Sequence, residues 1–309
     1  MRTKFYNILI VCAIILGLVT VLYSGGVGTT SSSFLKIPTT SRIIGLAESV
    51  TAVIDDPSAL SVNPAGLGNI ANMEILFSHY EWITDIDYEY LAVAVPSFKG
   101  IKGNQGILGG SIAYLHLPSF FQYDDWGEKI GDLNFSSLAV TFGYGQKIGN
   151  FTIGNSIKFI REQIDDISDT AFAIDLGTIY TVKLPSRKIA GFSLKGKSLK
   201  FGAALLNIGV GGGIKGYSTP MILKFGVGSR VGKGFLIDLD FEKPWDNRIR
   251  INLGIEYTLK GIISIRSGYR FIGYKTDTFT LGLGVAYNFG GKLARVGTAY
   301  APQLSLIHI

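Results

Sequence analysis

Bulky apolar residues alternate with small or polar residues along most of the chain. Between Ile249 and Leu259, every second residue is Ile, Leu or Tyr, and the positions between them hold Arg, Asn, Gly, Glu and Thr. Residues 138–145, 235–242 and 279–289 follow the same pattern. Because successive side chains of a β-strand point to opposite faces, this period of two predicts strands with one bulky apolar face and one smaller or polar face.

The smaller face distinguishes a soluble β-sandwich from a membrane barrel. A soluble sandwich turns a polar face to water, whereas the second face here is often Gly, Ala or Thr. Tyr and Phe gather near the strand ends, as in the aromatic girdles of membrane barrels. With 47% hydrophobic residues, 17% charged residues and 40 glycines, the chain is expected to be all-β. The predicted fold is a transmembrane antiparallel β-barrel of about 14 strands, which starts at 74–82 and ends with a strand from 304.

The connections between the predicted strands alternate in character. Those after odd-numbered strands carry acids, and those after even-numbered strands are mostly short and carry lysine. Short turns belong on the periplasmic side of outer-membrane barrels, so the N-terminal end of the mature chain is expected there too.

The longest outer loop is expected at 117–132. Its aromatic residues are predicted to contact a partner, and they are Phe120, Phe121, Tyr123 and Trp126.

The first 25 residues have the pattern of a secretory signal peptide. Arg2 and Lys4 precede an uninterrupted apolar run from Ile8 to Leu22, and small residues follow. An uncleaved membrane anchor is the alternative, because the apolar run is long. The predicted organisation is a signal peptide at 1–25, an N-terminal extension and hatch at 26–72, and a barrel at 73–309. Such a leader would export the protein, here to the bacterial outer membrane and its lipid.

Charged residues on the lumen face are predicted to pair across neighbouring strands. With 243–247 as a loop, Glu242 faces Arg248 and Asp240 faces Arg250. A turn at 260–262 sets Glu256 opposite Arg266 and Asn252 opposite Arg270. Directly facing opposite charges stabilise a strand pair by roughly 0.2–1 kcal/mol. The predicted ladder comprises Asp238, Asp240, Glu242, Arg248, Arg250, Glu256, Arg266 and Arg270. It either fixes strand register in a wet lumen or binds a solute.

Ahead of the strands, residues 55–67 read DDPSALSVNPAGL. Asp56 is expected to cap a short helix with Pro57 at its first position. Asn63 is expected to end that helix, because a residue before proline disfavours helical angles. Gly66 allows the chain to turn toward the first strand. A compact segment of this kind suits a plug inside the barrel.

Residues 33–67 resemble the N-terminal signature of the PorV/PorQ family, relatives of the FadL channels for hydrophobic solutes. The shared features are a Phe-Leu pair, an arginine ahead of Gly-Leu, adjacent aspartates and Asn-Pro-Ala-Gly-Leu. The resemblance continues through HYEWITDIDYEYLAVAVP (79–96) and IRSGYR (265–270). The hatch residues it indicates are Arg42, Gly45, Asp55, Asp56, Pro57, Asn63, Pro64 and Gly66.

This resemblance implies an outer-membrane barrel with an N-terminal hatch. A PorV-like protein would be a surface scaffold or receptor in type IX secretion, with secreted cargo proteins and secretion-machinery subunits as partners. A FadL-like protein would instead admit a hydrophobic small molecule past the hatch. A purely structural barrel is a third possibility. For Asp55 and Asp56, a role in anchoring the hatch is favoured over acid–base chemistry.

Residues 304–309, LSLIHI, alternate like a strand but are also the literal translation of a transposon-end adapter used in sequencing libraries. The sequence therefore predicts that Gln303 is the last genuine residue and that the C-terminus is truncated.

Residues that would support an enzyme are scarce. The chain has three histidines, and its one cysteine, Cys12, lies in the leader. No paired His or Cys spacing indicates a metal site, and the run at 209–216 does not match a phosphate-binding loop. Without Arg2 and Lys4 of the leader, the net charge falls from +6 to +4, which is too mild to favour nucleic acid. We therefore expect no catalytic activity, no cofactor and no metal.

Overall fold

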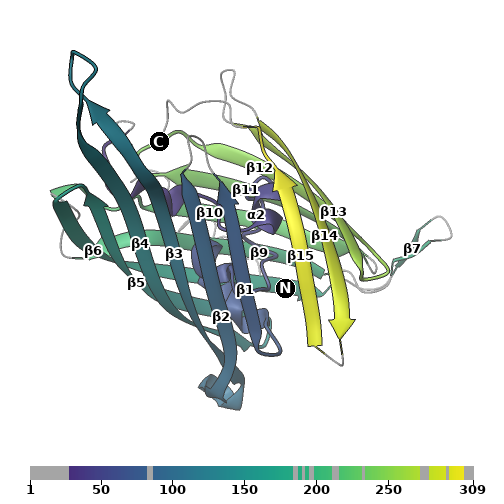
Figure 1. Ribbon diagram of the computed structural model, residues 1–309. Coiled ribbons are helices and arrows are strands. Elements are labelled where there is room, and N and C mark those ends of the chain that lie inside the picture. The colour runs from purple at the N-terminus through teal and green to yellow at the C-terminus, as the bar shows by residue number, and fades with distance from the viewer. Residues whose placement is uncertain are drawn as a thin grey trace.

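The computed structural model describes residues 28–81, 86–183, 187–189, 192–194, 198–210, 216–231, 234–271, 278–289 and 292–302. Its main element is a 13-stranded antiparallel sheet that curves around a central space (Figure 1). The strands of this sheet are β1 (Glu74–Glu81), β2 (Asp87–Lys99), β3 (Gln105–Tyr123), β4 (Lys129–Ile148), β5 (Phe151–Ile164), β6 (Ile167–Lys183), β9 (Ser198–Val210), β10 (Ile222–Val231), β11 (Phe235–Pro244), β12 (Arg250–Leu259), β13 (Ile263–Phe271), β14 (Thr278–Phe289) and β15 (Lys292–Tyr300). The predicted signal peptide and the predicted strand from 304 lie outside the described residues.

The strands separate bulky from small residues as the alternation predicts. Large apolar side chains such as Ile75, Phe142 and Leu283 are exposed on the outer face. Lumen-side residues such as Ala139 and Ala204 are buried. This inverted distribution is the one that a lipid-facing barrel wall requires. In the described part of the chain, no helix is long and apolar enough to cross a membrane.

The β3–β4 hairpin is longer than expected. The predicted loop at 117–132 is mostly strand, and the connection shrinks to 124–128. Phe120, Phe121 and Tyr123 therefore belong to β3, whereas Trp126 lies in the loop. The ladder continues because register shifts between Leu117 and Phe120 accommodate Pro118, and proline is tolerated at such irregularities.

Two further strands, β7 (Arg187–Ile189) and β8 (Phe192–Leu194), pair with each other between β6 and β9. The pattern did not predict this hairpin, because its strands have only three residues each.

The connections divide between two ends of the barrel. We call one the loop end, where β1 meets β2, β3 meets β4, β5 meets β6, β9 meets β10, β11 meets β12, and β13 meets β14. The other is the turn end, where β2 meets β3, β4 meets β5, β6 meets β9, β10 meets β11, β12 meets β13, and β14 meets β15.

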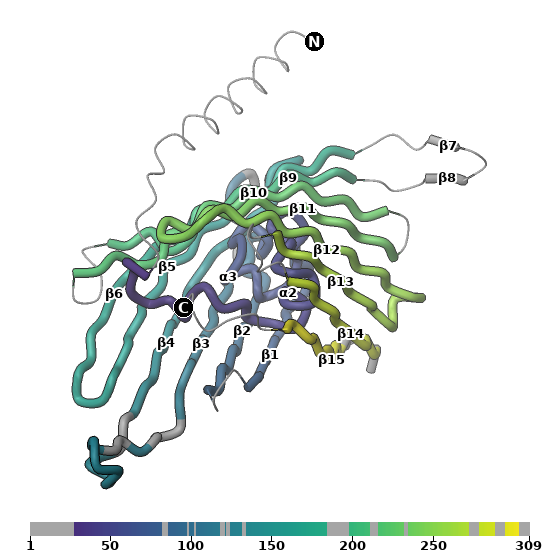
Figure 2. The backbone as a smooth tube through the Cα atoms, turned by 90° about the horizontal axis from the view of Figure 1, so that it is seen from above, coloured from purple at the N-terminus to yellow at the C-terminus, as the bar shows by residue number. Residues whose placement is uncertain are grey.

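The N-terminal segment fills the interior (Figure 2). We call residues 29–70 the hatch. It contains η1 (Ser33–Lys36), α2 (Ser41–Gly45), α3 (Ala59–Val62) and η2 (Pro64–Asn69), and η4 (Ile101–Gly103) lies in the β2–β3 turn.

The hatch starts at the loop end and finishes at the turn end. Thr30 contacts Asp246, and Ser31 donates to the carbonyl of Tyr217. Later in the chain, Gly68 lies against Gln146 and Thr152 beside the 149–150 turn. The expectation that the mature chain begins beside the short turns is therefore wrong for residues 30–36. The hatch traverses the lumen first, and β1 then starts at the turn end.

Within the described residues, β1 and β15 are edges of the sheet with no ladder between them. Glu74 of β1 and Arg295 of β15 approach to 3.8 Å across this seam. On the inner side of this seam, helix α2 packs against β14 and β15.

Candidate functional site: the hatch and its contact surface

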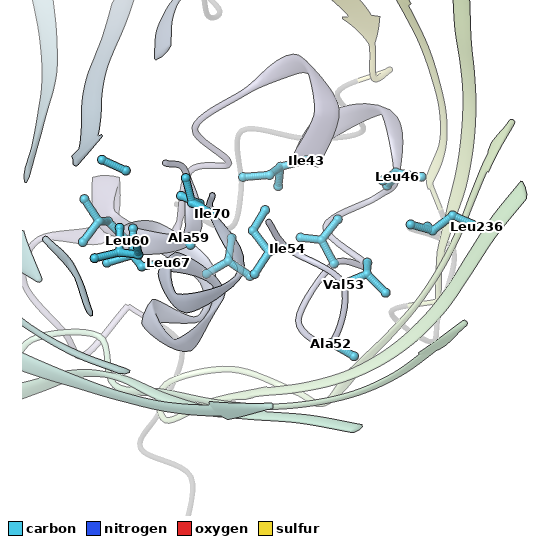
Figure 3. Packing of buried hydrophobic residues seen from close by; sticks show 14 residues of the cluster. Ile43, Leu46, Ala52, Val53, Ile54, Ala59, Leu60, Leu67, Ile70 and Leu236 are labelled. Atoms are coloured by element: carbon cyan, nitrogen blue, oxygen red, sulfur yellow. The ribbon is translucent and has the colours of Figure 1, made fainter. Parts of the chain in front are cut away.

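Most of the apolar core inside the barrel comes from the hatch, and three residues of the wall complete it, Ala94, Ile107 and Leu236. Figure 3 shows Ile43, Leu46, Ile54, Leu60 and Leu67 packed inside the barrel. These side chains are almost completely buried, so the hatch packs tightly within the lumen.

Asn63 joins two parts of the hatch to the barrel wall. Helix α3 ends one residue before it, as Pro64 predicts. Its Oδ1 accepts a hydrogen bond from Ala65 N at 3.2 Å, which caps η2. Its Nδ2 donates to the carbonyls of Thr51 at 2.8 Å and Thr178 at 3.3 Å.

Asp55 and Asp56 share one arginine. Nη1 of Arg42 lies 2.7 Å from Oδ1 of Asp55 and 2.7 Å from Oδ2 of Asp56. Asp55 also accepts from Arg230 of β10 at 3.1 Å. Burial alone raises the pKa of the Asp55 carboxyl, but Arg42 and Arg230 outweigh it and hold that pKa below its ordinary value of 3.8. Both carboxyls are thus engaged in ion pairs.

The expected cap position of Asp56 is off by two residues. Its Oδ1 accepts from the N–H of Ser58 at 3.0 Å in the turn that contains Pro57. Helix α3 begins only at Ala59, and its N-cap, Ser58, makes no side-chain capping bond. Asp56 therefore stabilises the turn ahead of the helix.

Glycines on the inner wall form the surface against which the hatch backbone packs. A Cβ on Gly154 would lie 2.5 Å from Ala65 N, one on Gly202 2.5 Å from Thr51 O, and one on Gly268 2.5 Å from the Leu46 carbonyl carbon. We call this set the glycine belt, and it comprises Gly143, Gly145, Gly154, Gly177, Gly202, Gly226, Gly254, Gly268 and Gly282. Gly282 meets Gly45 of the hatch, where an added Cβ would lie 3.1 Å from the Gly45 Cα.

Sequence reasoning recognised the small face but missed the belt. A signal was present in the strand register. Gly145 pairs with Gly154, which pairs with Gly177. Gly202 pairs with Gly226 in the same way. Glycines at one height on adjacent strands indicate close backbone approach from inside.

Beside Gly226 of the belt, which faces Asp240, the contact with the hatch is polar. Asp240 of β11 accepts hydrogen bonds from Val50 N at 3.0 Å, Thr51 N at 2.9 Å and Thr51 Oγ1 at 2.6 Å. Asp240 is fully buried. It therefore anchors the 50–51 backbone to the wall.

The β11–β12 part of the predicted ladder is shifted. Asp240 faces Asn252, and Glu242 faces Arg250 with Nη1 3.4 Å from Oε1. Arg248 is an exposed loop residue and belongs to no ladder. The prediction ended β11 at Glu242, but pairing with β10 extends it to Pro244 and moves the loop by two residues.

The β12–β13 part has the register that the three-residue turn predicts. Glu256 faces Arg266, and Arg266 Nε lies 2.7 Å from Glu256 Oε2. Arg270 faces Asn252, but its guanidinium pairs with Glu48 of the hatch. Asp238 faces Gly254 and accepts from Leu239 N at 3.1 Å. The ladder thus connects wall to hatch as well as strand to strand.

A buried cluster that the sequence reasoning missed lies on β5, β6 and β9. Lys158 Nζ lies 3.1 Å from Asp175 Oδ1 and 2.6 Å from Asn207 Oδ1. Asn207 N donates to Asp175 Oδ1 at 2.7 Å, where the β6–β9 register shifts. These side chains replace ladder hydrogen bonds at the irregularity. Charged residues at lumen-facing positions were the available signal.

Polar residues hold the start of the hatch at the loop end. Lys36 Nζ lies 2.8 Å from Asp246 Oδ2, and Thr30 Oγ1 donates to the same oxygen at 2.6 Å. We call Thr30, Lys36 and Asp246 the latch. Burial raises the pKa of Asp246, but the bonds from Lys36 and Thr30 outweigh it and lower that pKa below 3.8.

Two cavities adjoin the hatch. One, of about 20 Å³, lies between residues 35–38 and the wall, with apolar Leu35, Ile37 and Leu206 beside charged Lys224 and Glu242. That volume holds about one water. The other is an open recess of about 340 Å³ at the turn end, beside Gly68, Ile70 and Lys147.

At the tip of the β3–β4 hairpin, Trp126 is 90% exposed. Lys129 Nζ lies 3.8 Å from the centre of the Phe121 ring. Within the described residues, no group of three or more His, Cys, Asp or Glu side chains has the geometry of a metal site.

Comparisons with known proteins agree with this architecture. A model of an uncharacterised protein family, UPF0164, matches residues 23–163. A UPF0164 protein of Treponema pallidum (strain Nichols) is 22% identical over 213 residues, which are 65% of this chain and 51% of the relative. The chain thus spans about half the length of that curated relative.

Three solved structures are similar across 85% of this chain. A Pseudomonas aeruginosa FadL homologue has a TM-score of 0.52 at 12% identity over 89% of its length. The Ralstonia pickettii toluene transporter TbuX has a TM-score of 0.52 at 11% identity over 97% of its length. The Pseudomonas putida toluene transporter TodX has a TM-score of 0.53 at 10% identity over 96% of its length. The fold is therefore that of a FadL-like transmembrane β-barrel. None of these proteins has a PorV or PorQ name, so the comparisons support the FadL-like fold and not the finer PorV/PorQ resemblance.

Proposed function

We propose that this protein is an outer-membrane channel for hydrophobic small molecules, in which the hatch controls passage. The main support is a lumen occupied by a closely packed hatch in a barrel whose fold is shared by two toluene transporters. The hatch is held by hydrogen bonds, ion pairs and van der Waals contacts, all of which are reversible. A role as a channel rather than an enzyme fits these transporters.

The small cavity near residues 35–38 supports a closed state. Its lining combines apolar side chains with the charged residues Lys36, Glu48, Lys224 and Glu242, and apolar walls with a few polar groups suit a small amphipathic solute. At about 20 Å³ it excludes any such molecule. A solute therefore requires the hatch to shift, and the open recess at the turn end provides space beyond it.

A reversible disulfide tests this mechanism. Thr51→Cys with Asp240→Cys would join hatch to wall where Thr51 Oγ1 and Asp240 Oδ2 are 2.6 Å apart. The probe is radiolabelled toluene, taken up by cells that lack other channels of this type. We expect oxidation to reduce uptake to that of cells without the protein, and reduction to restore it.

The matched control is Thr258→Cys with Ser264→Cys, a facing pair on β12 and β13 whose hydroxyls are 3.0 Å apart. This bond lies within the wall, and oxidation should leave uptake unchanged. Equal uptake by the oxidised and reduced Thr51/Asp240 pair would refute hatch-controlled passage.

The surface scaffold for protein secretion is the second candidate. The exposed Trp126 at the hairpin tip favours it, because exposed aromatic residues commonly contact partners. Trp126→Ala would then abolish cargo capture, whereas the hatch disulfide would leave it intact. If Trp126→Ala left cargo capture unchanged, the hairpin tip would be excluded as the cargo site.

A further inference from the structure

Four lysines line one arc of the lumen mouth at the turn end. Each is among the first or last three residues of its strand at that end. We call them the basic arc, and they are Lys99 of β2, Lys147 of β4, Lys183 of β6 and Lys200 of β9. The strand order from β2 to β9 spans five strand spacings of about 4.8 Å, so the arc is roughly 24 Å long.

Two lysines of the arc stand at the open recess of about 340 Å³. Lys147 lines this recess, together with Gly68 at the end of the hatch. Lys99 faces Gln105, which lines the recess as well. Because facing residues of a strand pair share one side of the sheet, both lysines lie on the lumen side. None of the described residues that line the recess is acidic.

The other two lysines lie on the same side, farther along the wall. Lys200 faces Gly228, where an added Cβ would lie 2.4 Å from a methyl group of Val53 in the hatch. Lys183 faces Ser198, which lies two residues before Lys200 and therefore on the same face of β9. The whole arc thus borders the space that the hatch occupies.

The positive charge of the arc is not neutralised by its surroundings. Among the described residues, none of the four lysines has an ion-pair partner. The nearby acid of the hatch, Asp55, is already paired with Arg42 and with Arg230 of β10. The residues that face the arc across the strand pairs are neutral, and they are Gln105, Thr152, Thr181, Ser198 and Gly228. A concave surface with charges of one sign attracts ligands of the opposite sign.

We propose that the basic arc is a docking surface for an acidic soluble protein on the turn-end side of the barrel, which its short turns mark as periplasmic. Charge complementarity requires a partner rich in carboxylates. The length of the arc requires a macromolecule, because a small anion in the recess would reach Lys147 but not Lys200, three strands away. A protein interface of ordinary size covers about 800 Å² of each partner, which is roughly 30 Å across, and spans the arc.

Binding of a synthetic acidic peptide tests the arc. The probe is fluorescently labelled octaglutamate, and its anisotropy is measured with the full chain in a neutral detergent. We expect binding at low salt that weakens as salt is raised, because salt screens exposed charges. Lys99→Ser, Lys147→Ser, Lys183→Ser and Lys200→Ser together should weaken binding by about tenfold or more, since each removes one ion pair.

The control variant removes four exposed cations that lie outside the arc, by Lys129→Ser, Arg161→Ser, Arg248→Ser and Lys260→Ser. It loses the same net charge and should bind octaglutamate as the unmodified chain does. Heat-dependent gel mobility verifies that both variants are folded barrels. Equal weakening in the two variants would overturn the proposal, because net charge alone would then explain it.

Three further results would overturn the proposal. One is failure of octaglutamate to bind the unmodified chain. Another is competition by free glutamate at the same carboxylate concentration, which would assign the recess to a small anion. The third is tighter binding of polyphosphate of equal charge, which would indicate a phosphate polymer. The docking surface goes beyond the proposed channel, and because solute uptake is not measured here, either proposal can fail without the other.

Discussion

At the residue scale, single side chains hold the hatch to the wall, and Asp240 is the clearest example. One carboxylate oxygen accepts three hydrogen bonds from two consecutive hatch residues. The alternation pattern places Asp240 on the lumen face, but no pattern identifies its partner. That partner is a backbone segment 190 residues earlier in the chain. Because almost every residue has a backbone N–H group, the sequence does not show which one Asp240 binds.

Asp240→Ala should therefore destabilise the hatch more than the barrel. Charge-assisted hydrogen bonds of this kind contribute about 1.5–3 kcal/mol, so we expect a loss of about that size. The measurement is urea-dependent proteolysis of the hatch, alongside heat-dependent gel mobility of the barrel. Asp166→Ala removes an acid from the exposed β5–β6 turn and should change either value by less than about 0.5 kcal/mol. Equal effects of the two substitutions would contradict the anchoring role.

The glycine belt permits an equally local test. Gly154→Ala places a methyl group against backbone atoms of Pro64 and Ala65, and backbone atoms cannot rotate away as a side chain can. We expect the hatch to be displaced at a cost of about 1–3 kcal/mol, as for other overpacked sites. Gly110→Ala is the matched control, because its Cβ would meet nothing closer than 3.8 Å. Greater protease cleavage of the hatch in the first variant only is the expected result.

At the element scale, the strands were predictable and their ends were not. The register of β12 and β13 follows from a three-residue turn, so Glu256 faces Arg266 as expected. The predicted β11–β12 register was wrong, because Pro244 and its neighbours pair with β10 and so extend β11. Strand ends depend on what lies beside them, and side-chain alternation carries no such information.

The segment from Thr30 to Lys36 provides an element-scale prediction about pH. The folded-state pKa of Asp246 is lowered by its partners, so the latch stabilises the folded state fully above the ordinary value of 3.8. That contribution is lost as the pH falls through the lower folded-state pKa. A spin label on Thr29→Cys should stay immobile from neutral pH down to about pH 4 and become mobile in stronger acid.

Asp246→Asn is the control for the latch. It removes the charge that pairs with Lys36, so the label should be more mobile throughout the pH range. A mobility change centred near pH 6 would assign the transition to another group and contradict the role of Asp246.

At the scale of the whole molecule, the lipid-facing wall follows from the sequence, but the path of the hatch does not. Exposed apolar residues such as Ile75 and Leu283 lie on the bulky face of the alternation. That the hatch enters from the loop end depends on contacts such as Lys36 with Asp246, which lie 210 residues apart. Chain direction through a lumen is set by such pairs together, and no single motif encodes it.

The seam between β1 and β15 determines how the barrel can close. Both strands run from the turn end to the loop end, so they are parallel to each other. An antiparallel ladder can close only if one more strand, running the opposite way, lies between them. The strand that the alternation predicts from 304 would supply it. The two edges would then be about 9–10 Å apart, twice the usual strand spacing.

Cysteine pairs in the full chain measure that distance. Ile75→Cys with Val296→Cys joins outward positions on the two edges, and each lies one residue beyond the Glu74–Arg295 pair. With a strand between them, no disulfide should form, because the Cα atoms exceed the reach of about 7 Å, while a longer bis-maleimide should bridge them. Ile75→Cys with Val93→Cys, which face each other on β1 and β2, should oxidise readily. Ready oxidation of the first pair would mean that β1 and β15 meet directly, and the barrel would then close through a parallel contact.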